Sequence, residues 1–194
     1  MMRIITGRAR GVRLDTLSGE MTRPTLERTK EAVFSMLQFE IRDARVLDLF
    51  AGSGQLGLEA VSRGASGAVF CDRAKEAIEI VKRNIQKTRL AELCEVYCAD
   101  YTSFLRTLQG KEPFDIVFLD PPYAIGAVPT ALRALNDYHL LANGAKVVCE
   151  TGNAADVFGG DATLENCFDV VKQARYGAAY VSILTPKQKE EGTV

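Results

Sequence analysis

The segment Val46-Leu-Asp-Leu-Phe-Ala-Gly-Ser-Gly-Gln-Leu-Gly57 decides the fold class of this chain. Its first four residues predict a buried strand, and its three glycines follow the spacing G-x-G-x-x-G. A helix is predicted over residues 55–64, so the glycines lie in the turn between a strand and a helix. This arrangement is typical of an open α/β sheet that binds a nucleotide at a helix N-terminus.

Strands and helices alternate on the C-terminal side of this segment. We predict strands over residues 68–71, 94–98, 114–119 and 145–149, and helices over residues 74–89, 101–109 and 128–140. This alternation implies right-handed βαβ crossovers, hence a Rossmann-like α/β fold with a mostly parallel sheet and helices on both faces. Residues 168–175 and 179–184 predict two further strands, which form an antiparallel hairpin at the sheet edge.

The N-terminal side of the segment is basic. Residues 1–14 contain four arginines and no acidic residue, whereas the whole chain has a formal net charge of −1. We predict a short hairpin over residues 3–14 and a helix over residues 26–39. A basic arm indicates contact with nucleic acid, and a solubilising surface is an equal alternative on charge alone. The candidate RNA-binding residues are Arg3, Arg8, Arg10, Arg13 and Arg23.

Composition excludes several classes of protein. The 194 residues are 47% hydrophobic and 25% charged, which is typical of a folded globular chain. No apolar run approaches the ~20 residues of a membrane span, and no signal peptide is present, so we expect a cytoplasmic protein without a membrane partner. We also expect it to be a monomer. The five cysteines form no C-x-x-C pair, and His139 has no cysteine beside it. We expect reduced core thiols and no metal site.

Three acidic residues, Asp48, Asp72 and Asp100, lie at or just after the ends of successive predicted strands. With Asp72 twenty residues after Gly52, the glycine spacing also matches the dinucleotide fingerprint of an NAD oxidoreductase. However, an acid in the position of Asp48 suits a cationic ligand better than a pyrophosphate. S-adenosylmethionine is such a ligand, and the three acids would serve its amino-acid part, its ribose and its adenine amine. The alternative is that each acid only caps the following helix.

The candidate cofactor-binding residues lie in the turns that follow these three strands. They are Asp48, Phe50, Ala51, Gly52, Ser53, Gly54, Asp72, Arg73, Asp100 and Tyr101.

The segment Asp120-Pro121-Pro122-Tyr123 follows the strand predicted over residues 114–119. Two prolines remove two backbone donors, so the turn offers two acceptors, the Asp120 carboxylate and the Pro121 carbonyl. Two acceptors that hold an exocyclic amine would aim its lone pair at a methyl donor. Tyr123 offers a face on which a flipped base would stack. We predict these four residues as catalytic; the alternative is a loop that needs the prolines only for its shape.

Four parts of the sequence carry a resemblance to a known family: Arg3–Gly7 with Gly11–Leu14, Arg23–Phe34, Val46–Ala65 and Asp120–Tyr123. They resemble the bacterial 16S rRNA guanine-N2 methyltransferases, which are class I S-adenosylmethionine-dependent methyltransferases. The resemblance implies a seven-stranded sheet that ends in a hairpin. It also implies that the Gly52–Gly54 loop, Asp72 and Asp100 bind the cofactor, and that Asp120–Tyr123 hold the target amine.

Two residues depart from the family pattern. The family favours glycine where Thr6 stands, which we expect to concern only the arm, and a smaller residue where Gln55 borders the cofactor loop. We assign residues 1–45 to the basic hairpin arm and its helix, and residues 46–194 to an S-adenosylmethionine-binding methyltransferase domain.

The predicted activity is S-adenosylmethionine-dependent methylation of guanine N2 in small-subunit rRNA, free or within an assembling particle. The same chemistry on another amine, such as adenine in DNA or a protein side-chain amide, is the first alternative. The glycine spacing is also compatible with an NAD oxidoreductase, which is the second alternative. A non-catalytic RNA-binding module, which would not need Asp120, is the third possibility.

Overall fold

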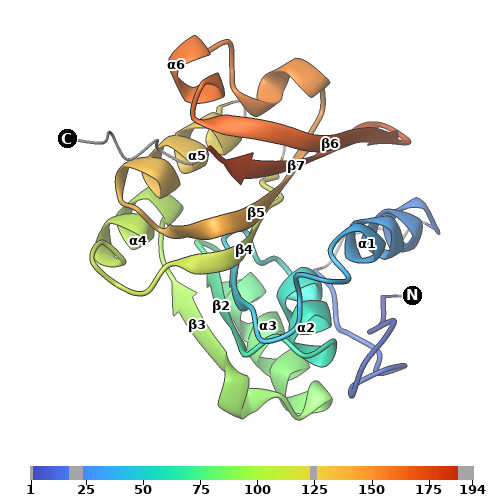
Figure 1. Ribbon diagram of the computed structural model, residues 1–194. Coiled ribbons are helices and arrows are strands. Elements are labelled where there is room, and N and C mark those ends of the chain that lie inside the picture. Colours follow the sequence, from blue (N-terminus) through green and yellow to red (C-terminus); the bar gives the residue numbers. More distant parts are fainter. Residues whose placement is uncertain (1, 18–23, 123–125, 188–194) are drawn as a thin grey trace.

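The protein has a single seven-stranded sheet in the order β3-β2-β1-β4-β5-β7-β6 (Figure 1). The computed structural model describes residues 2–17, 24–122 and 126–187. Strands β1 to β5 run parallel, and β7 is antiparallel to both of its neighbours. The strands are β1 (Arg45–Asp48), β2 (Gly67–Asp72), β3 (Cys94–Cys98), β4 (Phe114–Leu119), β5 (Leu141–Thr151), β6 (Phe168–Tyr176) and β7 (Ala179–Pro186).

Six helices and two short 3-10 turns complete the described elements. They are α1 (Pro24–Met36), α2 (Gln55–Ser62), α3 (Lys75–Thr88), η1 (Ala91–Leu93), α4 (Tyr101–Thr107), α5 (Ala127–Asp137), η2 (Ala154–Val157) and α6 (Ala162–Glu165). The predicted α/β fold, the parallel sheet and the hairpin at its edge are confirmed.

The structure differs from the predicted elements in several places. The first helix ends at Met36 rather than at residue 39, and a turn follows it. Strand β5 begins at Leu141 rather than at residue 145, because Asn143-Gly144 interrupts the apolar pattern while pairing with β4 continues across a register shift. Elements η2 and α6 were not predicted, since four residues are too few to show a helical period.

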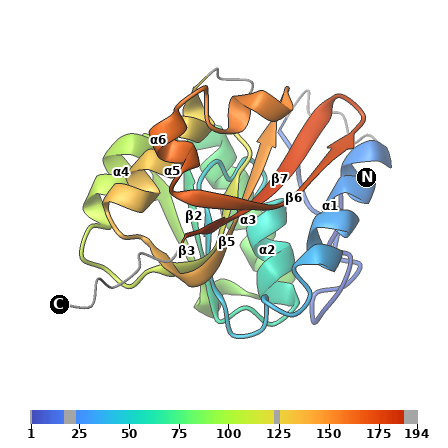
Figure 2. The same ribbon diagram turned by 45° about the horizontal axis from the view of Figure 1, so that its top comes forward.

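The sheet separates two apolar cores, and helices cover both faces (Figure 2). Helices α1, α2 and α3 pack on one face, around Phe34, Phe70 and Phe118. Helices α4, α5 and α6 pack on the other face, around Phe104 and Leu132. Because side chains alternate along a strand, residues two apart at a strand end belong to the same face.

All five cysteines are free, and Cys71 and Cys149 lie in the core as expected. Cys98 is exposed at the end of β3, an edge strand, so the expectation of a core thiol is wrong there. In the part of the chain that the structure describes, none of the helices is long and apolar enough to cross a bilayer.

Candidate active site

The glycine loop joins β1 to α2 in a conformation that only glycine adopts easily. Gly52 has a φ of 52° and Gly54, which precedes α2, has a φ of 76°. A Cβ atom on Gly57 would lie 2.4 Å from Cε1 of Phe70, so this glycine lets α2 pack directly on β2. The Asn84 side chain of α3 donates to the Ser53 carbonyl at 2.8 Å, which fixes the buried part of the loop.

Asp48 lies beneath this loop rather than on the surface. Its side chain is buried, and Oδ2 accepts a hydrogen bond of 3.0 Å from the Gly57 N–H in the first turn of α2. The pKa of the Asp48 carboxyl is raised to about 7: burial raises it most, the bond from Gly57 lowers it, and the nearby Asp72 carboxylate adds a smaller upward shift. A cation bound above the loop would restore the charge of Asp48, which is the electrostatic role predicted from the sequence.

Asp72 connects the glycine loop to α3. Its Oδ2 accepts from the Gly52 N–H at 3.0 Å, and its Oδ1 accepts from the Ala74 N–H at 2.8 Å. Arg73, the neighbouring candidate, is exposed. The carboxylate of Asp72 therefore lies directly beside the loop that the sequence assigned to the cofactor.

Asp100 caps α4, as the capping alternative predicted. Its Oδ1 accepts bonds from the Thr102 N–H at 3.0 Å, the Ser103 N–H at 3.2 Å and the Thr102 hydroxyl at 2.5 Å. These bonds, the Thr102 hydroxyl first, lower the pKa of the Asp100 carboxyl. Phe50 and Tyr101, two further candidates, pack with their ring centroids 5.0 Å apart, so the loop after β1 contacts the first residue of α4.

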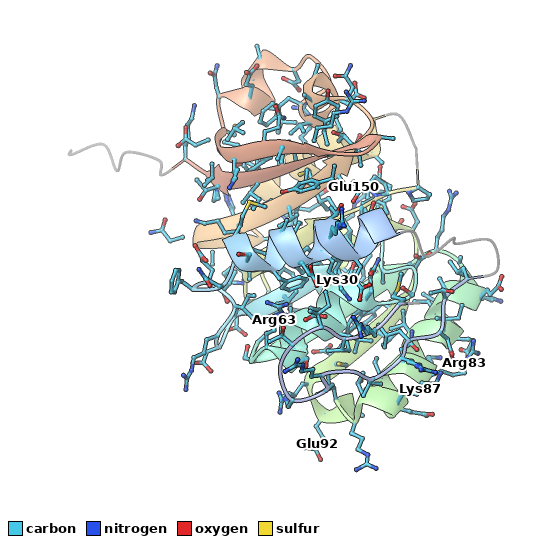
Figure 3. The ribbon with its side chains drawn as sticks, turned by 90° about the vertical axis from the view of Figure 1, so that its right-hand side faces the viewer. Lys30, Arg63, Arg83, Lys87, Glu92 and Glu150 are labelled. Atoms are coloured by element: carbon cyan, nitrogen blue, oxygen red, sulfur yellow. The ribbon has the colours of Figure 1, made fainter. Side chains whose placement is uncertain are left out.

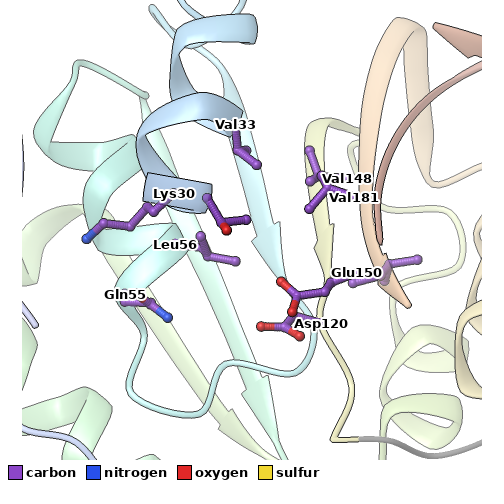
Figure 4. Close-up of a pocket in the computed structure, with 10 residues that line it drawn as sticks. Lys30, Val33, Gln55, Leu56, Asp120, Val148, Glu150 and Val181 are labelled. Carbon is purple, nitrogen blue, oxygen red and sulfur yellow. The ribbon is translucent and has the colours of Figure 1, made fainter. Parts of the chain in front are cut away.

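Asp120 lies in a pocket on the face of the sheet that α1 and α2 cover (Figure 4). The pocket is open to solvent, and it contains about 450 Å³ of space when that open part is included. Pro121 is half-buried and Pro122 is exposed, while Tyr123 falls outside the described residues. The remaining lining residues are Thr29, Lys30, Val33, Gln55, Leu56, Leu119, Val148, Glu150 and Val181.

Two of these lining residues bear on the sequence predictions. Gln55, the departure from the family pattern, lines the Asp120 pocket as well as opening α2 after the glycine loop. Glu150 was missed as a site residue, although it follows the strand predicted over residues 145–149 in the way that Asp48 and Asp72 follow theirs. The rule that selected those acids would have selected Glu150 too.

Comparison with known proteins gives the family. A family model described as conserved hypothetical protein 95 matches residues 2–185. The chain belongs to this family. Ribosomal RNA small subunit methyltransferase D of Haemophilus influenzae is 38% identical over 151 residues, which cover 77% of this chain and 78% of the relative. The protein of the same name from Escherichia coli K12 is 37% identical over 150 residues, covering 77% and 74%.

The solved structure of the Escherichia coli protein yhhF has a TM-score of 0.82 to this chain at 31% identity, and the match covers 96% of this chain and 98% of that one. The fold is therefore that of the class I methyltransferases, and the resemblance to the small-subunit rRNA methyltransferases is confirmed.

The family segment Val46–Ala65 also anchors the N-terminal arm (Figure 3). Glu59, which is fully buried, accepts from the Ile5 N–H at 2.8 Å and from the Thr6 N–H at 3.0 Å. It pairs with Lys30 of α1 at 3.3 Å and with Arg63 at 2.8 Å. Burial lowers the pKa of Lys30, and the Glu59 carboxylate opposes that shift.

Thr6, which replaces the glycine of the family pattern, takes part in this anchor. The expectation that Thr6 affects only the arm is therefore wrong. Arg63 donates to the Thr6 hydroxyl at 3.2 Å, and Ser62 donates to the Thr6 carbonyl at 2.7 Å. Gly7 has a φ of 87°, and a Cβ atom there would lie 1.8 Å from the Ser62 carbonyl oxygen. The arm is therefore a tightly packed part of the α2 face.

The predicted RNA-binding arginines lie on the outer side of the arm. Arg3, Arg8, Arg10 and Arg13 are exposed, and Arg23 falls outside the described residues. Arg3 pairs with Glu27 at 2.8 Å, and Arg8 reaches the Val61 carbonyl at 3.5 Å. Among the described residues, no cluster of three or more histidines, cysteines or acids could hold a metal ion.

Proposed function

We propose that this chain transfers a methyl group from S-adenosylmethionine to the N2 amine of a guanine in small-subunit rRNA. The observation that carries the proposal is the pocket in which Asp120 lies, at the end of β4 beside the first residues of α2. The relatives named as small-subunit rRNA methyltransferases support the class of reaction and of substrate.

The chemistry of the glycine loop fits the cofactor. Asp48 lies buried beneath the loop, and Asp72 contacts the loop directly. The Asp48 carboxyl beneath the loop would disfavour the pyrophosphate of NAD, whereas the sulfonium and ammonium of S-adenosylmethionine are attracted to it. We assign Asp48 to the positive charge of the cofactor, acting through the loop, and Asp72 and Asp100 to its ribose and its adenine.

When bound, S-adenosylmethionine supplies an electrophilic methyl group on its sulfonium. In our proposal Asp120 accepts one N–H of the guanine amine, and the Pro121 carbonyl accepts the other. This grip directs the lone pair of the amine, and the Asp120 carboxylate stabilises the positive charge that develops on the nitrogen. Formation of the new N–C bond would be matched by cleavage of the methyl–sulfur bond, which leaves S-adenosylhomocysteine, and the proton on the nitrogen would then pass to water. Tyr123 is assigned to stacking on the target base.

The exposed arginines of the arm provide the phosphate contacts in this proposal. Arg3, Arg8, Arg10 and Arg13 project from a segment that Glu59 holds firmly, so the charges lie on a rigid support. Arg23 is assigned the same role from the sequence. We propose that the protein acts in the cytoplasm as a monomer, on rRNA that is free or part of an assembling small subunit.

A methyl-transfer assay tests the proposal. The protein is incubated with labelled S-adenosylmethionine and small-subunit rRNA, either naked or bound to ribosomal proteins, and calorimetry measures binding of S-adenosylhomocysteine and of NAD. We expect label in the rRNA and binding of S-adenosylhomocysteine alone. Tight binding of NAD without S-adenosylhomocysteine would indicate an oxidoreductase. RNA binding without any label would indicate a non-catalytic module.

A further inference from the structure

A second carboxylate shares the pocket of Asp120. Leu119 of β4 and Cys149 of β5 are parallel partners, so Asp120 and Glu150 follow them at the same level of neighbouring strands. Phe118 and Val148, two residues earlier, belong to the core beneath α1 and α2, so Asp120 and Glu150 belong to that same face. Figure 4 shows both carboxylates directed into the pocket.

Apolar side chains form about half of the pocket lining around Glu150. Val33, Leu56, Val148 and Val181 line the pocket around it. Burial raises the pKa of the Glu150 carboxyl above its usual range. A carboxylate in such a place is costly unless a donor reaches it, so the pocket favours a ligand that presents N–H groups.

Lys30, the lysine that lines the pocket, contacts the Arg3 carbonyl and Glu59 rather than the two pocket carboxylates. Lys30 Nζ donates to the Arg3 carbonyl at 2.7 Å and pairs with Glu59 at 3.3 Å. Figure 4 shows its ammonium directed away from Asp120 and Glu150. Within the described residues, no lysine or arginine forms an ion pair with Glu150.

We propose that Glu150 selects guanine: its carboxylate accepts the N1–H of the base while Asp120 accepts from the neighbouring N2 amine. This inference rests on the function proposed above. Guanine presents these two donors side by side on one edge. Adenine and cytosine instead place a ring nitrogen with a lone pair beside their exocyclic amine, and that lone pair would face the Glu150 carboxylate. Two adjacent carboxylates should thus bind guanine more favourably than adenine or cytosine.

Glu150 is a specificity-determining residue in this scheme, and its effect is separable from the chemical step. Replacing guanine by 2-aminopurine keeps the amine at position 2 but turns N1 from a donor into an acceptor. A site built to accept from that N–H should then lose about 10²-fold or more in rate. In Glu150→Gln the side-chain amide can donate to the altered N1, so the penalty should shrink.

The experiment compares rRNA that carries guanine at the mapped target with ligated rRNA that carries 2-aminopurine there. Single-turnover methylation is measured for the wild type, Glu150→Gln and Glu150→Asp. We expect a guanine preference of about 10²-fold or more for the wild type, and of about tenfold or less for Glu150→Gln. Glu150→Asp keeps a carboxylate and should keep the preference at a lower rate. The loss of O6 in 2-aminopurine affects all variants alike.

Controls separate this inference from folding and from the proposed function. Glu92→Gln, at an exposed acid of η1, should leave the preference unchanged. S-adenosylhomocysteine binding should be equal in all variants; a weaker affinity in Glu150→Gln would assign Glu150 to the cofactor and overturn the inference. An unchanged preference in Glu150→Gln, or no methylation of either RNA by a folded Glu150→Gln, would also overturn it. If the wild type fails to methylate guanine, the proposed function itself fails.

Discussion

The carboxylate of Asp48 lies beneath the glycine loop and accepts a hydrogen bond of 3.0 Å from the backbone N–H of Gly57. This bond attaches the end of β1 to the first turn of α2, and it holds a buried acid beneath the loop that we assign to the cofactor. The same acid destabilises the protein alone and attracts a cation, so stability and binding should respond in opposite directions when it is changed.

We expect Asp48→Asn to stabilise the cofactor-free protein at high pH. Burial raises the pKa of Asp48 to about 7, so the native state holds its proton more tightly than the unfolded state. The Asp48 carboxyl therefore makes its full contribution to the free energy of unfolding below about pH 4. As the pH rises to about 7, that contribution falls by up to about 4 kcal/mol. Asparagine keeps an acceptor for Gly57 and removes this loss.

The measurement is the free energy of unfolding of both proteins from urea titrations at pH 5 and pH 8, with S-adenosylmethionine affinity at pH 8. Asp48→Asn should gain more stability at pH 8 than at pH 5 and bind S-adenosylmethionine more weakly. Equal pH dependence in the two proteins would show that Asp48 does not titrate in this range.

Glu59→Gln should destabilise the whole fold, because Glu59 joins α2 to α1 and to the arm. The change would leave Lys30 buried without its charge partner, and breaking a buried pair in this way costs about 3–5 kcal/mol. Glu31→Gln, at an exposed acid of α1, is the matched control and should stay within about 0.5 kcal/mol of the wild type. Similar urea midpoints for the two variants would contradict the stabilising role of Glu59.

The arm should contribute to RNA affinity through charge alone. Arg10→Gln with Arg13→Gln changes two exposed side chains and leaves the anchor at Glu59 intact, whereas removal of residues 1–14 would leave Glu59 buried without its arm partners. Each lost phosphate contact should lower the slope of log affinity against log salt by about 1. Lys111→Gln, at an exposed position after α4, is the control. An unchanged slope would make the arm purely structural.

Asp120→Asn should lower single-turnover methylation by about 10²-fold or more, because the amide keeps the shape and one acceptor but loses the charge that stabilises the developing cation. S-adenosylhomocysteine affinity should hardly change. Asp137→Asn, at an exposed acid that ends α5, should behave as the wild type in both assays. Near-normal methylation by Asp120→Asn would exclude the proposed role of the Asp120 carboxylate in orienting the amine and stabilising its charge.

The parallel sheet around the glycine loop was predictable because local signals agree there. The apolar run before Gly52, the glycine spacing and the later alternation of elements all favour one parallel sheet, and the structure has that sheet. The start of β5 was less predictable, since its pairing with β4 crosses a register shift that the hydrophobic pattern of the sequence does not indicate.

The arm anchor and the pocket depend on contacts between distant residues. Glu59 lies 54 residues from Ile5, and the sequence around Glu59 reads as an ordinary acid on a helix. Its burial follows only from the packing of α1, α2 and the arm together. Asp120 was identified from its prolines, whereas its partnership with Glu150 follows from the pairing of β4 and β5.

The identity of the methylated nucleoside tests the central claim most directly. Small-subunit rRNA methylated by the purified protein is digested to nucleosides and separated by mass spectrometry against standards of each methylated base. Our account predicts one added methyl group per RNA, recovered as N2-methylguanosine with the wild type and nearly absent with Asp120→Asn. Recovery of the methyl group on adenine, on cytosine or on another atom of guanine would contradict it.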